Sequence, residues 1–272
     1  FPIDEVRSKF PGLQRMVDGR QAIFFDGPGG SQSPDSVGDA VRHYLLHQNA
    51  NVGMSFATSV ETDRLIDDAL RACADFVGCE NHREIVFGQN MTSLTIQLAS
   101  ALSRTWNPGD EVVVTRLDHD SNVHPWMLAA EWSGATLRRV DIDPDGCTHN
   151  RSSLEDSINE NTVLVAVGAA SNLSGTINDV SGIAEKAHAV GAEVFVDAVH
   201  YEPHCLINVE AMGCEYLACS PYKFFVTHQG VLLGRSLRLP ELPVAKLRPT
   251  IVQTPFRWIT GTQTHAEMVG TI

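Results

Sequence analysis

Short apolar runs that alternate with helical patterns limit the fold of this chain more than any other feature. Runs rich in β-branched and aliphatic residues are typical of buried strands, and they occur at 84–88, 111–115, 136–140, 162–168, 193–197 and 216–219. Between them, residues 92–106 have apolar side chains at helical spacing, and residues 179–190 run from an N-cap aspartate to a following glycine. The pattern predicts a doubly wound α/β fold, with a mixed, mainly parallel sheet between two layers of helices.

The continuity of this alternation also predicts the domain organisation. No repeat, low-complexity tract or linker interrupts residues 60–235, which we interpret as one domain. Residues 239–255 carry four prolines, a composition typical of an irregular connection, and residues 265–272 look like a helix that is cut off early. We therefore expect an N-terminal segment at 1–20, a large domain at 21–238, and a connection with the start of a truncated small domain at 239–272.

Charge and cysteine usage exclude several kinds of partner. The net charge of −13 and the pI near 5.2 argue against binding to nucleic acid or to anionic membranes, because both attract clustered Lys and Arg. The six cysteines form no CxxC pair, so neither a zinc ribbon nor a disulfide framework is indicated, and a cytoplasmic location is expected. No apolar run reaches the roughly 18 residues of a membrane span, and the first residues lack the order of a signal peptide.

Two residues that follow predicted strands carry the functional argument. Asp197 ends the strand at 193–197, and the carboxyl ends of strands line the ligand crevice of an open parallel sheet. Lys223 follows the strand at 216–219 and is flanked by aromatic residues, which can desolvate the amine and make it a nucleophile toward an aldehyde. Singly, each has an ordinary explanation, a turn-capping acid and a surface lysine. Together they favour a site in which the acid partners a pyridinium nitrogen and the amine holds an aldehyde cofactor.

A resemblance to a known family rests on three segments around these residues. They are Val-Asp-Ala-Val-His at 196–200, Ser-Pro-Tyr-Lys at 220–223 and Gly-Val-Leu-Leu-Gly-Arg at 230–235. The segments resemble the core of the fold-type I, class V aminotransferase family, and of cysteine desulfurase-like proteins in particular. The resemblance extends over nearly the whole chain. It implies pyridoxal 5'-phosphate bound as a Schiff base on Lys223, with Asp197 beside the ring nitrogen.

Further matches to the family imply roles for other residues. Asp118-His119, with the residues that follow it to Trp126, resembles the family's acid-His segment and implies that His119 stacks on the ring and helps to move protons. The segment 171–176 implies that Asn172 contacts the ring hydroxyl or the substrate. His200 and Ser220 would give hydrogen bonds to the phosphate. The segments 26–30 and 49–52 resemble those near the family's substrate pocket.

The phosphate is expected at the start of a helix, where free backbone N–H groups and the helix dipole favour an anion. Residues 89–93 lie between a strand and the long helix, and they match the family's phosphate-binding turn. Thr92 is the first candidate, with Met91 and Ser93 beside it. The segment 260–263 resembles a Gly-Thr segment that reaches the phosphate of a partner subunit, which implies a role for Thr262 and a homodimer with a shared active site.

The sequence also departs from the desulfurase pattern. Tyr222 stands where a His usually precedes the lysine, His200 where Gln is usual, and Val226-Thr227 where Gly-Pro is common. The family's persulfide-forming cysteine and its substrate-carboxylate arginine belong to the small domain, and Cys205 is interpreted as packing. The resemblance implies desulfurase-like chemistry on an amino acid, with a possible sulfur-acceptor protein, and an aminotransferase or epimerase is the alternative.

Three other classes of protein remain as alternatives. A metal-dependent hydrolase would use ligand types that could meet at strand ends, namely Asp118, His119, Asp120, His124, His200 and His204, but no compact ligand motif organises them. A nicotinamide-binding protein is suggested by the glycines of segment 26–30, which lack the full G-x-G-x-x-G pattern. The third is an inactive protein that keeps the fold for binding.

Overall fold

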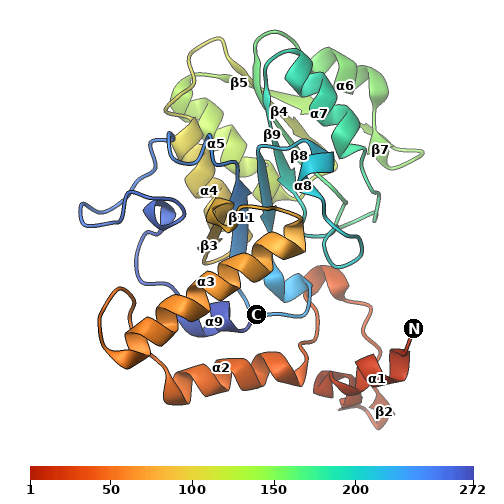
Figure 1. Cartoon of the computed structure of the whole chain (residues 1–272). Coiled ribbons are helices and arrows are strands. Elements are labelled where there is room, and N and C mark those ends of the chain that lie inside the picture. The colour runs from red at the N-terminus through yellow and green to blue at the C-terminus, as the bar shows by residue number, and fades with distance from the viewer.

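The computed structural model describes residues 1–272 and is built around a seven-stranded sheet (Figure 1). The strand order from one edge is β3 (Ile85–Gly88), β11 (Gly230–Gly234), β10 (Tyr216–Cys219), β9 (Glu193–Asp197), β8 (Thr162–Gly168), β4 (Glu111–Thr115) and β5 (Thr136–Val140). Strand β11 alone runs in the direction opposite to the other six strands. The mixed, mainly parallel sheet confirms the predicted fold class.

The predicted strands agree closely with the observed ones. Five of the six have the bounds read from the sequence, and β3 begins one residue later than predicted. All residues of β4, β10 and β11 are buried, as expected for a sheet that is covered on both faces. Strand β11 was not among the predicted strands. Two small hairpins lie outside the main sheet: β1 (Met16–Val17) with β2 (Arg20–Gln21), and β6 (Ile142–Asp143) with β7 (Thr148–His149).

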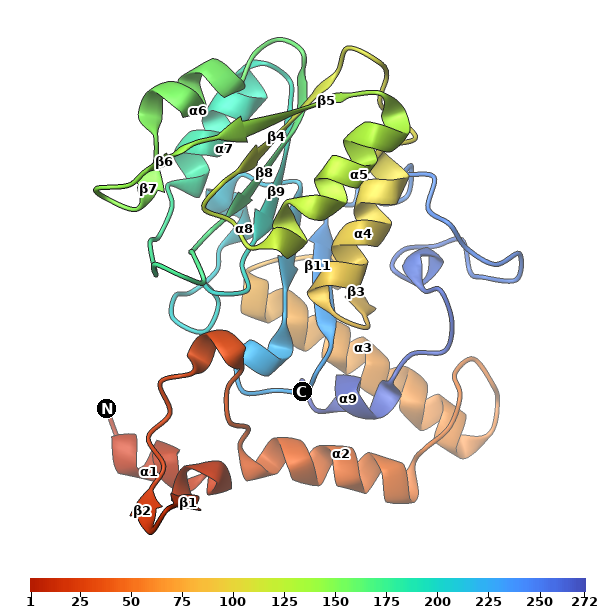
Figure 2. The ribbon, with the colours of Figure 1, turned by 180° about the vertical axis from the view of Figure 1, so that it is seen from behind.

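Helices cover the two faces of the sheet and give it two hydrophobic cores. One core lies under α3 (Ala57–Val77), α7 (Val180–Ala189) and α8 (Val209–Met212). The other lies under α4 (Met91–Leu102) and α5 (His124–Ser133), on the opposite face (Figures 1 and 2). Helix α6 (Arg151–Ser157) packs beside β5. The observed α7 lies within one residue of its prediction at each end, while α4 ends four residues before the predicted end.

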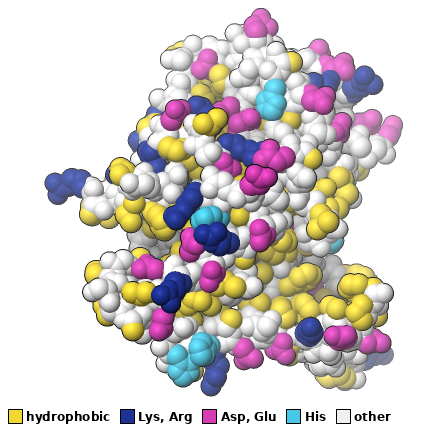
Figure 3. Space-filling model, viewed as in Figure 1, with side chains coloured by type: hydrophobic (Ala, Val, Ile, Leu, Met, Phe, Trp, Pro, Cys, Tyr) yellow, Lys and Arg dark blue, Asp and Glu magenta, His cyan; other side chains and the backbone are white.

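Both ends of the chain lie below the sheet in Figures 1 and 2, the N-terminus at the outer edge beside α1 and the C-terminus nearer the centre beside α9. The N-terminal part contains α1 (Ile3–Ser8) and α2 (Asp35–His47), and α9 (His265–Val269) packs on α2 and α3. Hydrophobic side chains are exposed around α1 and the β1–β2 hairpin, whereas acidic and basic side chains intermingle over the sheet domain (Figure 3). None of the helices has both the length and the hydrophobicity that crossing a membrane requires.

The connection after β11 packs against the sheet domain. Leu239, Leu242 and Val244 are buried in the core under α4. Trp258 is buried there as well, and its indole N–H donates to the Leu239 carbonyl at 3.2 Å. Residues 239–258 therefore share a core with the predicted large domain. The domain boundaries at residues 20 and 238 stay a prediction.

Candidate active site

The carboxyl edge of the sheet brings together segments that are far apart in sequence. Because β9 pairs in parallel with both β8 and β10, Asp197 lies opposite Gly168 on one side and Ala218 on the other. The loop with Asn172 leaves this edge after β8, and the turn with Lys223 leaves it after β10. His119 follows β4, the next strand beyond β8. The parallel register thus places the acid and the amine at one edge, as the sequence predicts.

Asp197 is a buried acid with few stabilising partners. Its side chain is 7% exposed, and Oδ1 accepts the Val199 N–H at 3.0 Å. Burial raises the pKa of Asp197 to about 6, and the charges of His119 and Lys223 partly oppose that rise in its pKa. The opposing effects show that both basic groups lie within electrostatic reach of the acid. A cationic ring nitrogen beside Asp197 would favour its ionised form further.

Lys223 is held in a short turn that limits its exposure. It ends the 3-10 turn Pro221–Lys223, its backbone N–H donates to the Ser220 carbonyl at 2.9 Å, and the residue is 8% exposed. The ammonium group donates to the Pro28 carbonyl and lies 4.9 Å from the centroid of the Tyr222 ring. No carboxylate forms a salt bridge with it. A buried amine without a paired acid is suited to covalent chemistry with an aldehyde.

Two histidines flank the pair. His119 is exposed, and its Nδ1 accepts the Ser121 N–H at 3.1 Å, which leaves Nε2 free. His200 is partly buried; burial lowers its pKa to about 4, and the positive charges of Lys223 and His119 lower it further. His200 is therefore neutral at physiological pH, and it can donate one hydrogen bond without adding charge.

A second acid of the site, Asp118, lies against Gly168 at the end of β8. Thr115 Oγ1 donates to Asp118 Oδ2 at 2.7 Å, and burial raises the pKa of Asp118 to about 7, with the neighbouring Asp197 acting in the same direction. Gly168 makes this packing possible, because a Cβ atom there would lie 2.3 Å from Asp118 Oδ1. The sequence pattern included Asp118 as the acid before His119 and as a candidate ligand of the metal-hydrolase alternative, and it gave no sign of the packing against Gly168.

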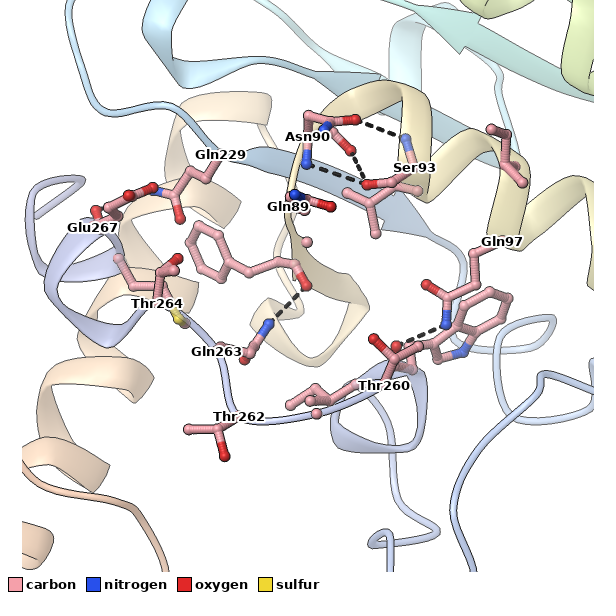
Figure 4. Close-up of a pocket in the computed structure, with 18 of the residues that line it drawn as sticks. Gln89, Asn90, Ser93, Gln97, Gln229, Thr260, Thr262, Gln263, Thr264 and Glu267 are labelled. Carbon is pink, nitrogen blue, oxygen red and sulfur yellow. Dashed lines mark hydrogen bonds between the residues drawn. The ribbon is translucent and has the colours of Figure 1, made fainter.

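The start of α4 offers an anion site at the same edge, and Figure 4 shows its N-cap. Asn90 caps the helix, and its Oδ1 accepts the Ser93 N–H at 2.8 Å while Ser93 Oγ accepts the Asn90 N–H at 3.2 Å. This capping box uses both polar groups of Ser93. The N–H groups of Met91 and Thr92 have no hydrogen-bond partner. The free donors of the helix start are thus those of Met91 and Thr92, while Ser93 serves the cap.

Two cavities reach the Tyr222–Lys223 turn. The first, of about 950 Å³, is lined by the start of α4, by Tyr222 and by segment 260–264 (Figure 4). In this segment Gln263 donates to the Phe87 carbonyl at 2.7 Å, and Thr262 is exposed. Tyr222 stacks on His228, with ring centroids 4.5 Å apart.

The second cavity, of about 1020 Å³, reaches Lys223 itself. Asn172 and His200 line it, and so do residues 24–28 of the N-terminal part. The segment 49–52 does not line either cavity. Of the two segments that resemble the family's substrate pocket, only 26–30 therefore lies beside the amine.

The ligand types of the metal-hydrolase alternative do not gather into a metal site. No group of three or more His, Cys, Asp and Glu side chains is arranged to hold a metal ion. The groups that the edge does bring together are a buried acid, an unpaired buried amine and two free helix N–H donors. This donor set fits a cofactor with a ring nitrogen, an aldehyde and a phosphate.

The mainly parallel seven-stranded sheet, covered by helices on both faces, gives the chain the α/β architecture of the fold-type I class. The model of the family described as aminotransferase class-V matches residues 23–260, and the chain belongs to this family.

Named relatives and a solved structure agree with the family. A cysteine desulfurase of Dickeya dadantii (strain 3937) is 34% identical over 246 residues, which cover 89% of this chain and 60% of that protein. An aminotransferase-like protein of Gibberella zeae is also 34% identical, with the same coverage of both chains. The apo structure of a cysteine desulfurase from Thermococcus onnurineus NA1 is 27% identical, with a TM-score of 0.89, and the match covers 98% of this chain and 68% of that one. The chain thus spans about 60% of the length of the first curated relatives it matches.

Proposed function

We propose that this chain is the cofactor-binding part of a pyridoxal-phosphate enzyme that acts on an amino acid, with desulfurase-like cleavage of a C–S bond and transfer of the sulfur. One observation carries the proposal: Asp197 and Lys223 are both buried at one edge of the sheet, where Asp197 ends β9 and Lys223 follows the neighbouring parallel strand β10. The similarity to named cysteine desulfurases supports the choice of reaction.

Each group at the edge has a separate task. The cofactor, when bound, supplies an electron sink for the bonds at the substrate α-carbon. Lys223 would hold its aldehyde carbon, give up that bond to the substrate amine, and then carry a proton to or from the α-carbon. Asp197 would keep the ring nitrogen protonated, because the ion pair that forms offsets the cost of burying the carboxylate.

The remaining groups orient the cofactor. His119 would cover one face of the ring and share in proton transfer, and Asn172 would contact the ring hydroxyl or the substrate. The free N–H groups of Met91 and Thr92 would hold the phosphate at the start of α4. Neutral His200 and the hydroxyl of Ser220 would add hydrogen bonds on the other side of the phosphate. Ser93 contributes to this set by capping the helix.

The proposal extends to partners and to the domains. The exposed position of Thr262 supports a contact with a second subunit, so we propose a homodimer with a shared active site. Residues 21–238 would form the cofactor-binding domain, and 239–272 would lead toward a small domain. A sulfur-acceptor protein and a cytoplasmic location complete the proposal.

Aminotransferase chemistry is the second candidate, since a 34% identical relative is named aminotransferase-like. The two reactions give different products from cysteine. With a thiol reductant present to reduce the transferred sulfur, a desulfurase gives alanine and sulfide, whereas an aminotransferase, which passes the amino group to a keto-acid co-substrate, converts cysteine into its keto acid. Assays for both products on the full-length protein decide between the two reactions.

Covalent labelling tests the cofactor assignment directly. The chain has four lysines: Lys9, Lys186, Lys223 and Lys246. We expect a yellow protein whose absorbance shifts on reduction with borohydride, and peptide mapping should find the label on Lys223 alone. The matched variant Lys186→Ala should keep the label and Lys223→Ala should lose it. A label on any other lysine contradicts the assignment.

A further inference from the structure

A third buried acid at the carboxyl edge has no part in the tasks described above. Glu202 is 5% exposed and belongs to the turn that follows β9, where its N–H donates to the Ala198 carbonyl at 3.0 Å. Its Oε1 atom accepts the Ser220 N–H at 3.1 Å. Its Oε2 atom is buried without a hydrogen-bond partner, and the neighbouring Cys219 thiol is at best a weak donor.

The bond to Ser220 joins the two halves of the site. Ala218 and Asp197 form the last pair of the β9–β10 ladder, so the chain segments beyond them have no further strand pairing with each other. Ser220 opens the turn that ends at Lys223, and Glu202 lies in the turn that begins after Asp197. Glu202 therefore continues the link between the segment of the acid and the segment of the amine beyond the sheet.

The surroundings of Glu202 disfavour its ionised form. The titratable groups that face it are Cys73 on α3, Cys219 on β10, Asp197 on β9 and Lys223 on the turn, and of these only Lys223 is cationic. Burial is the main reason that the pKa of Glu202 lies well above its usual range, and Asp197 acts in the same direction. The Ser220 N–H and Lys223 act against it, but a neutral carboxyl group can still accept the Ser220 N–H through its carbonyl oxygen.

We propose that Glu202 is a positioning residue that acts as a neutral carboxylic acid and holds the Lys223 turn against the Asp197 segment through the Ser220 N–H. In its neutral form it leaves the negative charge of this edge to Asp197, beside the proposed position of the ring nitrogen. The role in cofactor binding rests on the proposed function. The protonation state of Glu202 does not.

Unfolding of the full chain, from which any aldehyde cofactor has been removed, tests the protonation state of Glu202. An acid whose pKa is higher in the folded than in the unfolded state costs stability as pH rises from the unfolded pKa to the folded pKa. As pH rises above the unfolded pKa, the unfolding constant of the wild type should therefore rise relative to that of Glu202→Gln, by at most about tenfold per pH unit because one proton is involved. The exposed control Glu131→Gln should give a constant ratio. A pH-independent ratio for Glu202→Gln overturns the neutral acid.

Borohydride labelling of Lys223 tests the positioning role. Glu202→Gln keeps an oxygen for the Ser220 N–H and should keep the label, whereas Glu202→Leu leaves that N–H buried and unpaired and should slow labelling on the order of tenfold. Equal labelling of the wild type and Glu202→Leu would overturn the positioning role. Absence of label on wild-type Lys223 would instead contradict the proposed function, and the unfolding experiment would still decide the state of Glu202.

Discussion

The carboxyl edge of the sheet and the N-terminal segment, residues 1–33, both reach Lys223, yet they are held in place by different means. At the edge, Asp197, Glu202 and Lys223 are each less than 9% exposed and follow buried strands. In the N-terminal segment no residue is buried, and the ring of Phe25 is 94% exposed.

The N-terminal segment makes only a few contacts with the turn that carries Lys223. Ser31 bonds to the Tyr222 carbonyl and to the Phe225 N–H, and the ring of Phe10 meets that of Phe225 edge-on at 5.4 Å. The Pro28 carbonyl accepts from Lys223. Strand register and burial therefore fix the acid and the amine. The N-terminal segment covers the amine through contacts whose loss should lower the free energy of unfolding only slightly.

Two phenylalanines test this contrast with the largest expected effect. Phe195 on β9 is fully buried and packs against the ring of Trp126 at 5.0 Å. Phe195→Ala removes that packing and leaves a cavity, so the free energy of unfolding should fall by about 3–5 kcal/mol. Urea unfolding measures the change. Phe25→Ala in the N-terminal segment is the matched control and should change stability by less than about 0.5 kcal/mol. Equal losses for the two variants would contradict the distinction between the regions.

The same contrast explains how much the sequence could predict. The strands were predicted nearly residue by residue, because a buried parallel strand is a continuous apolar run with polar turns at both ends. Asp197 and Lys223 could be placed at one edge for the same reason, since the carboxyl ends of parallel strands meet there. These predictions depend on local pattern and on one rule of topology.

The missed features depend on partners that are distant in sequence. Nothing around Glu202 shows that its carboxyl group meets the Ser220 N–H, because this contact exists only once β9 and β10 pair. The capping role of Ser93 had a local signal, the Asn90-x-x-Ser93 spacing, but the anion-site interpretation took precedence. The packing of Leu239 and Leu242 under α4 was also hidden, because the prolines around them suggested an irregular connection.

Asp197→Asn tests the electrostatic side of the edge, with a smaller effect than the loss of Phe195. Burial raises the pKa of Asp197 in the folded state to about 6, above its unfolded value near 3.8. A raised acid pKa means that stability falls as pH rises between these two values and is then constant. Without cofactor, the wild type should therefore lose up to about 3 kcal/mol relative to Asp197→Asn between pH 4 and pH 7. Urea unfolding across this range measures the trend. If the stability difference between the wild type and Asp197→Asn does not change with pH, burial of the Asp197 carboxylate does not destabilise the fold.

Ser31→Ala tests the weakest link, the one between the two regions. Ser31 Oγ donates to the Tyr222 carbonyl at 3.0 Å and accepts the Phe225 N–H at 2.6 Å, and Phe225 has a positive φ of 78° that a non-glycine residue adopts only under constraint. Loss of the hydroxyl should lower the free energy of unfolding by only about 1 kcal/mol, but it should speed amide exchange at Phe225 because that N–H loses its acceptor. The control Ser8→Ala removes an exposed bond within α1 and should leave the exchange at Phe225 unchanged. If Ser31→Ala exchanges at Phe225 as slowly as the wild type, the Ser31 side chain does not hold the Lys223 turn, and the N-terminal segment covers the amine through the contacts of Phe10 and Pro28 instead.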